Sequence, residues 1–351
     1  MFVQLLTSLP SLHFQSQHFP MKKPKLDEVY YFENGFRKIR PYEYFYETFT
    51  KERWLNRTLF DVFSKEFRSK SPEYYKEAIL NGNVTVNDKI PTLETVLTHS
   101  DCIKHKACRH EPPVFGEIKI LFNDSKLLVI DKPASIPAHP TGRYTKNSVT
   151  EILKHEFGFE FLSCINRLDR LTSGIMLLAL DKETAKSMGN KLKKCEVKKK
   201  YVCKVNGKFP DEIHCKEPIK VINHRNSTSA VQVGGKECET YFKRLKFDGE
   251  FSIVECSPIT GRGHQIRVHL DYLGYPIVND PVYNPRTPHY RALVPEGVPV
   301  DGKCAECENP IEDPQLESLY ICLHSFNYKT EDWEFETEFP SWANIEEKKD
   351  I

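Results

Sequence analysis

The sequence predicts an α+β protein with a mixed, largely antiparallel sheet, and two patterns lead to this prediction. Short β-branched or aromatic runs, each bounded by turn residues, recur along the chain after its first third, which indicates strands. Apolar residues at helical spacing lie between these runs at about 147–157, 183–195 and 264–273. The predicted strands are IKILF, KLLVIDKP, GIMLLALD, YVCKVNG, ETYFKRLKF and FSIVECSPI.

Composition supports a folded protein of two domains, or one large domain with an appended module. The chain has 351 residues, of which 39% are hydrophobic and 12% aromatic, and this content excludes a wholly disordered protein. The formal net charge is +1, so a nucleic-acid surface requires an uneven distribution of charge. Eleven scattered cysteines predict reduced thiols, and without a run of about 18 apolar residues we expect no membrane-spanning helix.

Changes of composition divide the chain into three parts. We expect residues 1–27 to form a disordered tail, followed by an aromatic lead-in with a small module over 28–112 and a catalytic-size domain over 113–346. Residues 284–316, rich in Pro, Glu and Asp, are predicted to be a surface insertion. The first 26 residues contain no acidic residue, as in mitochondrial presequences, but they also contain no Arg. We therefore expect a cytoplasmic or nuclear protein, with the mitochondrion as the alternative.

The second part begins with aromatic residues at 28–50, which we expect to pack onto a folded body. From Arg53, apolar residues follow at helical spacing, and the segment 71–80 predicts a second helix with a Ser cap and Pro at its first position. The following "NGNVTVND" predicts a turn and a short strand with Val84 and Val86 on one face. These elements make a compact module, for which RNA binding and another interaction role both stay open.

The stretch "INRLDRLTSG" places an acid between two arginines at the start of an apolar strand. Arg167 and Arg170 flank Asp169 and would keep its carboxylate ionised, with a lowered pKa. Such an acid suits a nucleophile or an electrostatic stabiliser better than a general acid. A structural Arg–Asp pair explains this stretch equally well.

A second group of polar residues follows two glycines, Gly261 and Gly263, that permit a close approach. Helical spacing puts Ile266 and Leu270 on one face, so we expect that the polar residues cannot all be buried with them. Arg267 is a candidate partner for a carboxylate from another segment, since guanidinium binds carboxylates bidentately. The polar residues are His264, Gln265, Arg267 and His269, and the two histidines are poorly spaced for a metal site.

A third group is a local run of lysines: eight lysines and two acids lie between Lys182 and Lys200. A solvated helix face produces such a run as often as a binding site does. Tyr201 follows the run directly, at the start of a predicted strand. Cations beside an aromatic ring suit a phosphate backbone with a base stacked next to it.

Together these motifs make the chain resemble the RluA-type pseudouridine synthases, in particular their eukaryotic branch. That family carries His-Arg-Leu-Asp-Arg-x-Thr-Ser-Gly, a Lys-Tyr element and Gly-Arg-Thr-His-Gln-Ile-Arg-x-His, which match "NRLDRLTSG", "KKKY" and "GRGHQIRVH" here, in the same order. A matching "YICLHSFNY" follows, so the resemblance covers roughly 113–343. Residues 51–112 resemble the S4-like RNA-binding module that often precedes this domain.

The resemblance implies an isomerase that converts uridine to pseudouridine in RNA, with tRNA favoured, and that acts as a monomer without cofactor or metal. Asp169 matches the catalytic aspartate, Tyr201 the tyrosine that stacks on the target base, and Arg267 the arginine that pairs with the aspartate. Arg167 matches the side chain that fills the gap left by the flipped nucleotide. The expected RNA contacts are Arg167, His139, Arg262, His264, Gln265, Lys193, Lys194, Lys198, Lys199 and Lys200.

Two positions depart from the family pattern. Asn166 stands where the bacterial motif has His, although eukaryotic members often carry Asn. Gly263 replaces the usual Thr or Ser before His264. If Gly263 caps the following helix, the replacement costs only a few tenths of a kcal/mol. We expect this change to affect RNA contacts or loop order more than chemistry.

Three other functions compete with this interpretation. Cys304 and Cys307 form one CxxC, which favours a structural or incidental role over a zinc site, and a zinc deaminase would need H-x-E, which is absent from the chain. A glycosidase would need paired carboxylates, and the motifs nominate one acid. A catalytically inactive RNA-binding protein that keeps the fold would use the module and the lysine run but not Asp169.

Overall fold

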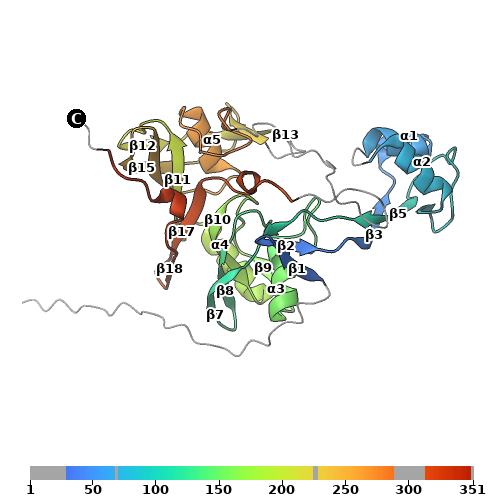
Figure 1. The fold of residues 1–351 in the computed structure, drawn as a ribbon, viewed down its shortest axis with the longest axis horizontal. Helices are drawn as coiled ribbons and strands as arrows, with labels where there is room; N and C mark the ends of the chain where they lie inside the picture. Colours follow the sequence, from blue (N-terminus) through green and yellow to red (C-terminus); the bar gives the residue numbers. More distant parts are fainter. Residues whose placement is uncertain (1–28, 68–69, 224–227, 288–312, 349–351) are drawn as a thin grey trace, which may run out of the picture.

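The computed structural model describes most of the chain (Figure 1). The predicted tail at 1–27 lies outside the described residues, as do most of the predicted insertion and both Cys304 and Cys307. No helix in the described part has the length and apolar character needed to cross a membrane. The described residues are 29–67, 70–223, 228–287 and 313–348.

Two short helices and a three-stranded sheet form the small module at one end of the molecule (Figure 1). The module has its own core of buried residues, in which Val84 and Val86 lie on the inner face of their strand, as predicted. Its strands pair in the order β3-β5-β4. The elements are β3 (Tyr42–Phe49), α1 (Leu59–Glu66), α2 (Pro72–Leu80), β4 (Val84–Val86) and β5 (Cys102–Arg109).

The first helix of the module begins later than its apolar spacing predicted. The hydroxyl of Thr58 accepts a hydrogen bond from the backbone N–H of Asp61, and this cap starts α1 at Leu59. The residues before it form a single 3-10 turn, η1 (Glu52–Trp54). The second helix has the predicted start, with Ser71 as cap and Pro72 as its first residue.

The aromatic lead-in divides between the module and the large domain. Strand β2 (Phe36–Ile39) pairs with β1 (Tyr30–Glu33) on one side and with β6 (Val114–Phe115) on the other. Strands β1 and β2 contribute Tyr30 and Ile39 to the core of the large domain. Strand β3 instead pairs with β5, and it leaves Phe45 58% and Phe49 61% exposed. The prediction that the aromatic lead-in packs onto a folded body is therefore confirmed for β1 and β2. It is wrong for Phe45 and Phe49, because β3 places them on the open face of the module's sheet.

The large domain is built on a sheet of ten strands among the described residues. Its path runs β12-β15-β16-β11-β17-β10-β8-β7, with β9 paired to β10 and β18 paired to β17. Within this path β10 and β17 run parallel and the other pairs run antiparallel, which confirms the predicted mixed, largely antiparallel sheet. The strands are β7 (Lys119–Asn123), β8 (Leu127–Lys132), β9 (Ser163–Cys164), β10 (Ser173–Ala179), β11 (Lys198–Asn206), β12 (Glu212–Cys215), β15 (Thr240–Phe247), β16 (Phe251–Pro258), β17 (Leu323–Lys329) and β18 (Glu334–Glu336).

The helices of the large domain lie where their apolar spacing predicted them. They are α3 (Val149–Phe157), α4 (Lys182–Lys193) and α5 (Gln265–Tyr272). Smaller elements complete the described fold: the hairpin β13 (Ile219–Asn223) and β14 (Thr228–Val231), and the 3-10 turns η2 (Leu316–Leu319) and η3 (Ser341–Ala343).

Three neighbouring strands bring the motifs together at the middle of the sheet. Strand β17 lies between β11, which carries Tyr201, and β10, which follows the loop of Asp169. Strand β10 is buried along nearly its whole length, so the loop before it rests on a rigid element. Tyr201 packs against two buried clusters, one including Leu168 and the other Leu171, which border Asp169 in the sequence.

The parallel pair of β10 and β17 depends on a glycine. Gly174 has φ of +111° and pairs with Ser325, and a Cβ at Gly174 would lie 2.6 Å from the backbone nitrogen of Ser325 and closer still to its carbonyl oxygen. A side chain therefore cannot fit unless the two strands separate.

We expect Gly174→Ala to lower the free energy of unfolding by more than about 3 kcal/mol, because strain at a positive φ adds to overpacking against a backbone. Urea unfolding measures the change. Gly189→Ala in α4 is the matched control: its Cβ would meet no neighbour, so about 0.5–1 kcal/mol of added stability is expected. Equal stabilities of Gly174→Ala and the unmodified chain would contradict the proposed fit.

Candidate active site

A buried arginine joins the two motifs that the sequence singled out. Nη1 of Arg267, on α5, donates to Oδ2 of Asp169 over 2.7 Å, across 98 positions of sequence. The arginine side chain is 5% exposed, whereas the Asp169 side chain is 32% exposed. The predicted partner of Asp169 is therefore present, and the carboxylate keeps one side open to an incoming molecule.

A second acid holds the other side of the guanidinium. Asp280 is fully buried and binds Arg267 through two bonds, 2.7 Å from Nε and 3.0 Å from Nη2. The same carboxylate accepts hydrogen bonds from the backbone N–H groups of Val282 and Tyr283. Because its oxygens are all engaged and it cannot reach solvent, Asp280 fixes the orientation in which Arg267 meets Asp169.

The charge of Asp169 follows from a balance of opposing effects. Burial raises the pKa of a carboxyl group, but His264 when protonated, together with the charge and the hydrogen bond of Arg267, outweighs it, so the pKa of Asp169 lies below its ordinary value. Burial lowers the pKa of His264, which leaves this ring neutral at pH 7. The lasting positive charge at the carboxylate is thus Arg267, and Asp169 is an anion suited to nucleophilic or electrostatic work.

His264 is oriented toward the same carboxylate. Its Nε2 lies 3.7 Å from Oδ2 of Asp169, and its Nδ1 lies 2.8 Å from the hydroxyl of Tyr283. The ring of Tyr283 also lies under the guanidinium of Arg267, 4.9 Å from its central carbon. His264 itself is the residue that precedes α5, with φ of +59°, so Gly263 is not the helix cap that the sequence suggested.

Helix α5 buries more polar residues than its spacing suggested: of the four polar residues named from the sequence, His264 alone stays partly exposed. Gln265, Arg267 and His269 are 4%, 4% and 0% exposed, together with the apolar residues of the helix. Each polar group has a partner: His269 bonds the hydroxyl of Thr240 and the carbonyl of Glu217 through its two ring nitrogens. A prediction from apolar spacing assumes that polar side chains face water, whereas in this helix protein groups supply their hydrogen bonds.

Gln265 fixes the loop before the helix. Its amide oxygen accepts from the hydroxyl of Thr260 and the N–H of Arg262, and its amide nitrogen donates to the carbonyl of Glu239 and the hydroxyl of Thr240. With every position engaged and little surface exposed, the amide holds the loop, which does not favour the RNA contact expected for it. Among the described residues, no atom lies within 4 Å of the place that a Cβ at Gly263 would take, and the end of the Lys199 side chain is the neighbour of Gly261.

The remaining expected RNA contacts fall into separate places. Arg167, two positions before Asp169, is exposed and donates to Nε2 of His139 over 3.1 Å, so these two side chains form one unit. Arg262 is exposed, while Lys199 reaches the carbonyl of Thr260 in the same loop. Lys200 pairs with Glu255, and the exposed lysines away from this loop are Lys193, Lys194 and Lys198.

Two residues near Asp169 escaped the sequence analysis. Lys132 is fully buried and donates to the carbonyls of Pro133, Ile136 and Arg170, so it ties the end of β8 to the Asp169 loop. Asp280 is the second. Its signal was an acid between apolar residues within a segment already rich in candidate groups, but no motif marked it. Arg170 keeps a structural position, above the ring of Tyr144.

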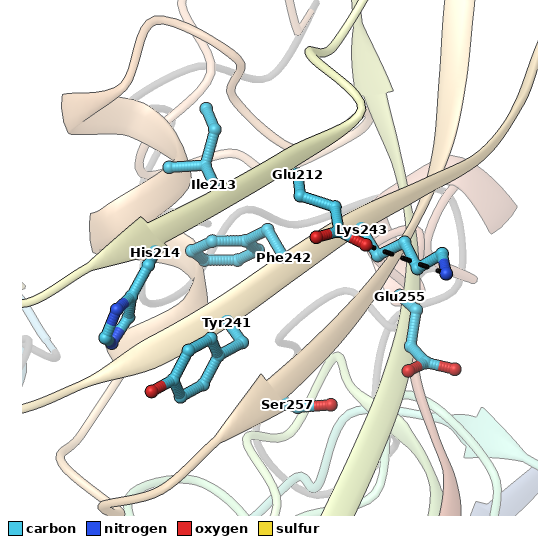
Figure 2. A pocket seen from close by; sticks show the side chains of 8 residues that line it. All are labelled: Glu212, Ile213, His214, Tyr241, Phe242, Lys243, Glu255 and Ser257. Carbon is cyan, nitrogen blue, oxygen red and sulfur yellow. Dashed lines mark ion pairs between the residues drawn. The ribbon is translucent and has the colours of Figure 1, made fainter.

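A surface cavity lies elsewhere on the large domain. Figure 2 shows the side chains of β12, β15 and β16 that line it, including His214, Tyr241 and an ion pair of Glu212 with Lys243. Its volume is about 470 Å³. Glu255, which lines the cavity, is followed by Cys256, and Cys256 pairs with Tyr201 across β16 and β11. Because successive residues of a strand point to opposite faces, Glu255 and Tyr201 project from opposite faces of the sheet. The cavity is thus separate from the Asp169 centre. Across the described residues, no group of three or more His, Cys, Asp or Glu side chains is arranged to hold a metal ion.

The fold and the Asp169–Arg267 centre define a class of RNA-modifying isomerase, and comparison with known proteins identifies it. Residues 126–272, which contain all three motifs, match the family model described as RNA pseudouridylate synthase. The chain belongs to the RluA-type pseudouridine synthase family, whose members are isomerases.

Individual relatives extend this similarity over most of the chain. The mitochondrial tRNA pseudouridine(32) synthase of Saccharomyces cerevisiae is 41% identical, over 94% of this chain and 83% of the yeast protein. The tRNA pseudouridine(31) synthase of the same yeast is 30% identical, over 93% of this chain and 100% of the relative. Pseudouridylate synthase RPUSD2 of Mus musculus is 44% identical over 77% of this chain, and the match spans 48% of the mouse protein.

Replacing Asp280 tests the clamp on Arg267. Asp280→Asn keeps the shape but removes a charge, which leaves the buried guanidinium with Asp169 as its one anionic partner among the described residues. We expect a loss of about 3 kcal/mol in urea unfolding and a fall on the order of tenfold or more in pseudouridine formation. Asp332→Asn, at an exposed acid that pairs with Lys191 away from this cluster, is the control and should change neither. A fully active and stable Asp280→Asn would contradict the clamp.

Lys132 makes stability depend on pH. Burial lowers the pKa of Lys132 from 10.5 to about 7 in the folded protein. Between these values the unfolded chain holds more protons than the folded one, so rising pH favours folding. The measurement is the difference in unfolding free energy between the unmodified chain and Lys132→Met, as a function of pH. From pH 7 toward pH 10 this difference should rise by up to about 1.4 kcal/mol for each pH unit. A difference that stays constant over this pH range would refute the shift.

Proposed function

We propose that this protein converts a uridine of the tRNA anticodon arm to pseudouridine, with Asp169 as the catalytic carboxylate. The observation that carries the proposal is the geometry of Asp169: an ionised, partly exposed acid, bound by a buried arginine that is itself fixed by Asp280. The names of the two yeast relatives support tRNA as the substrate.

The reaction rearranges bonds within one nucleotide. The glycosidic bond between N1 of the uracil and C1′ of the ribose breaks, the detached base turns, and C5 bonds to C1′. C5 then loses its proton and N1 gains one, so the product is an isomer of the substrate. Asp169 either attacks C1′ or assists loss of the base by removing a proton, and Arg267 holds the carboxylate in place for either role. The lowered pKa of Asp169 keeps it unprotonated for both.

The target base must leave the helix stack before its glycosidic bond becomes accessible. In our proposal the uracil stacks on Tyr201, which borders the Asp169 loop, and Arg167 takes the vacated place in the RNA. The pairing of Arg167 with His139 supports this role, because it holds an exposed cation in one orientation beside the acid. Arg262 and Lys199, joined to one loop, are proposed to contact phosphates.

The small module is proposed to be an S4-like RNA-binding module. Its support is its own buried core, two capped helices and a three-stranded sheet at the end of the molecule away from β12. For the compartment, the name of one yeast relative supports the mitochondrion, the alternative that the sequence left open.

The proposal is tested by incubating the purified protein with transcribed tRNA and mapping pseudouridine by carbodiimide chemistry. We expect modification of an anticodon-arm uridine, and a loss of at least about 10³-fold in Asp169→Asn, because an amide cannot replace the carboxylate. Asp332→Asn, at an exposed acid, is the control and should remain active.

Two outcomes separate the competing functions. A protein that binds tRNA but forms no pseudouridine in any RNA pool is the inactive RNA-binding protein. Activity of Asp169→Asn equal to that of the unmodified chain would remove Asp169 from its role and leave the reaction itself in place.

A further inference from the structure

We propose that Asn166 and Tyr328 are positioning residues, which hold Tyr201 in a fixed place relative to the Asp169 loop through one chain of hydrogen bonds. The inference rests on the proposed function for the role of Tyr201 and goes beyond it in naming what supports that ring. It also assigns a task to Asn166, which differs from the His of the bacterial motif.

The chain starts with an amide whose orientation is fixed. The amide oxygen of Asn166 accepts the backbone N–H of Leu177 over 2.7 Å, so its nitrogen must point the other way. That nitrogen donates to the hydroxyl of Tyr328 over 3.0 Å. Asn166 lies three residues before Asp169, so the amide anchors the catalytic loop to β10 and reaches β17 at the same time.

Tyr328 passes the constraint on to Tyr201. The two hydroxyl oxygens lie 2.9 Å apart, and the rings meet at 61° with their centres 6.5 Å apart. Tyr328 is 1% exposed and belongs to a buried cluster with Leu177, so its own ring has little freedom to move. Because β17 lies between β10 and β11, Tyr328 stands where a side chain can join the Asp169 side of the sheet to the Tyr201 strand.

This arrangement has a consequence for what Tyr201 does. Its hydroxyl is bound to Tyr328, and the face of the ring is the part that our proposed function presents to the substrate. Burial raises the pKa of Tyr201 well above 10, and Tyr328 raises it further, so the phenol stays protonated at neutral pH. Tyr201 then serves as a stacking surface held at a set position, and the removal of a proton falls to another group.

The amide suits this position because it offers an acceptor and a donor from one planar group. Leu177 N–H and the Tyr328 hydroxyl need these two functions in directions that a short side chain can reach. Asn166→Ala would remove the hydrogen bonds of Asn166 to the Leu177 N–H and to the Tyr328 hydroxyl, whereas Tyr328→Phe removes one hydroxyl and keeps the ring.

The test measures single-turnover rates of pseudouridine formation on transcribed tRNA in two protein backgrounds. We expect Tyr328→Phe and Asn166→Ala each to slow pseudouridine formation on the order of tenfold, because the ring loses its fixed place, with RNA affinity unchanged. In a Tyr201→Phe background, where the last bond of the chain is already absent, the same changes should slow the reaction less than about twofold further. Tyr275→Phe, on a ring packed against Phe209, is the control and should match the unmodified rate.

Two results would overturn the inference. The first is a rate for Tyr328→Phe equal to that of the unmodified chain. The second is an equal slowing by Tyr328→Phe in both backgrounds, which would mark a general structural role. Thermal unfolding of each variant identifies any that fail to fold. If Asn166→Ala fails to fold, Tyr328→Phe alone suffices for the test.

A spectroscopic measurement keeps the inference testable apart from activity. With tyrosines labelled with carbon-13 at the hydroxyl-bearing carbon, the Tyr201 resonance is assigned by its loss in Tyr201→Phe. It should shift in Tyr328→Phe and in Asn166→Ala, and stay in place in Tyr275→Phe. An unmoved resonance overturns the hydrogen-bond chain, whereas a shifted resonance in a protein that forms no pseudouridine upholds the chain and rejects the proposed function.

Discussion

One buried cation organises the candidate active site. Arg267, Asp280 and Asp169 would each be unfavourable inside the protein alone, because burial opposes every charged form. Together they compensate one another, and the innermost member, Asp280, is also held by two backbone N–H groups. Rigidity therefore passes outward from Asp280 through the guanidinium to Asp169, and of these three groups Asp169 alone is substantially exposed to solvent.

The sequence predicted the outer part of this arrangement and missed the inner part. Asp169 and Arg267 stood in recognisable motifs, and the affinity of guanidinium for carboxylate suggested the pair. Asp280 carried no such mark, since a single acid in a Pro-rich segment gives no sign of which cation it meets. The burial of α5 was mispredicted for a related reason: apolar spacing does not show that Gln265 and His269 find protein partners in place of water.

For the fold, local patterns predicted where six strands of the large sheet lie along the chain. They did not predict which strands pair with each other. The runs that became β8, β10, β11 and β16 are short and apolar, which is a local property. Which strand lies beside which is decided by contacts between distant segments, and β17 enters between β10 and β11 without any signal in its own residues. The hydrogen bonds from Asn166 to Tyr328 and Tyr201 exist only through that placement.

The place of β17 also determines when the enzyme can become complete during its synthesis. Strands β10 and β11 lie next to each other in the sequence, yet in the sheet they are separated by a strand that the ribosome adds more than 100 residues later. Until β17 arrives, the edges of β10 and β11 that it will cover are unpaired, and such edges favour association with other chains. A nascent chain stalled before residue 323 would hold Asp169, Tyr201 and Arg267 and still lack the strand that joins their supports.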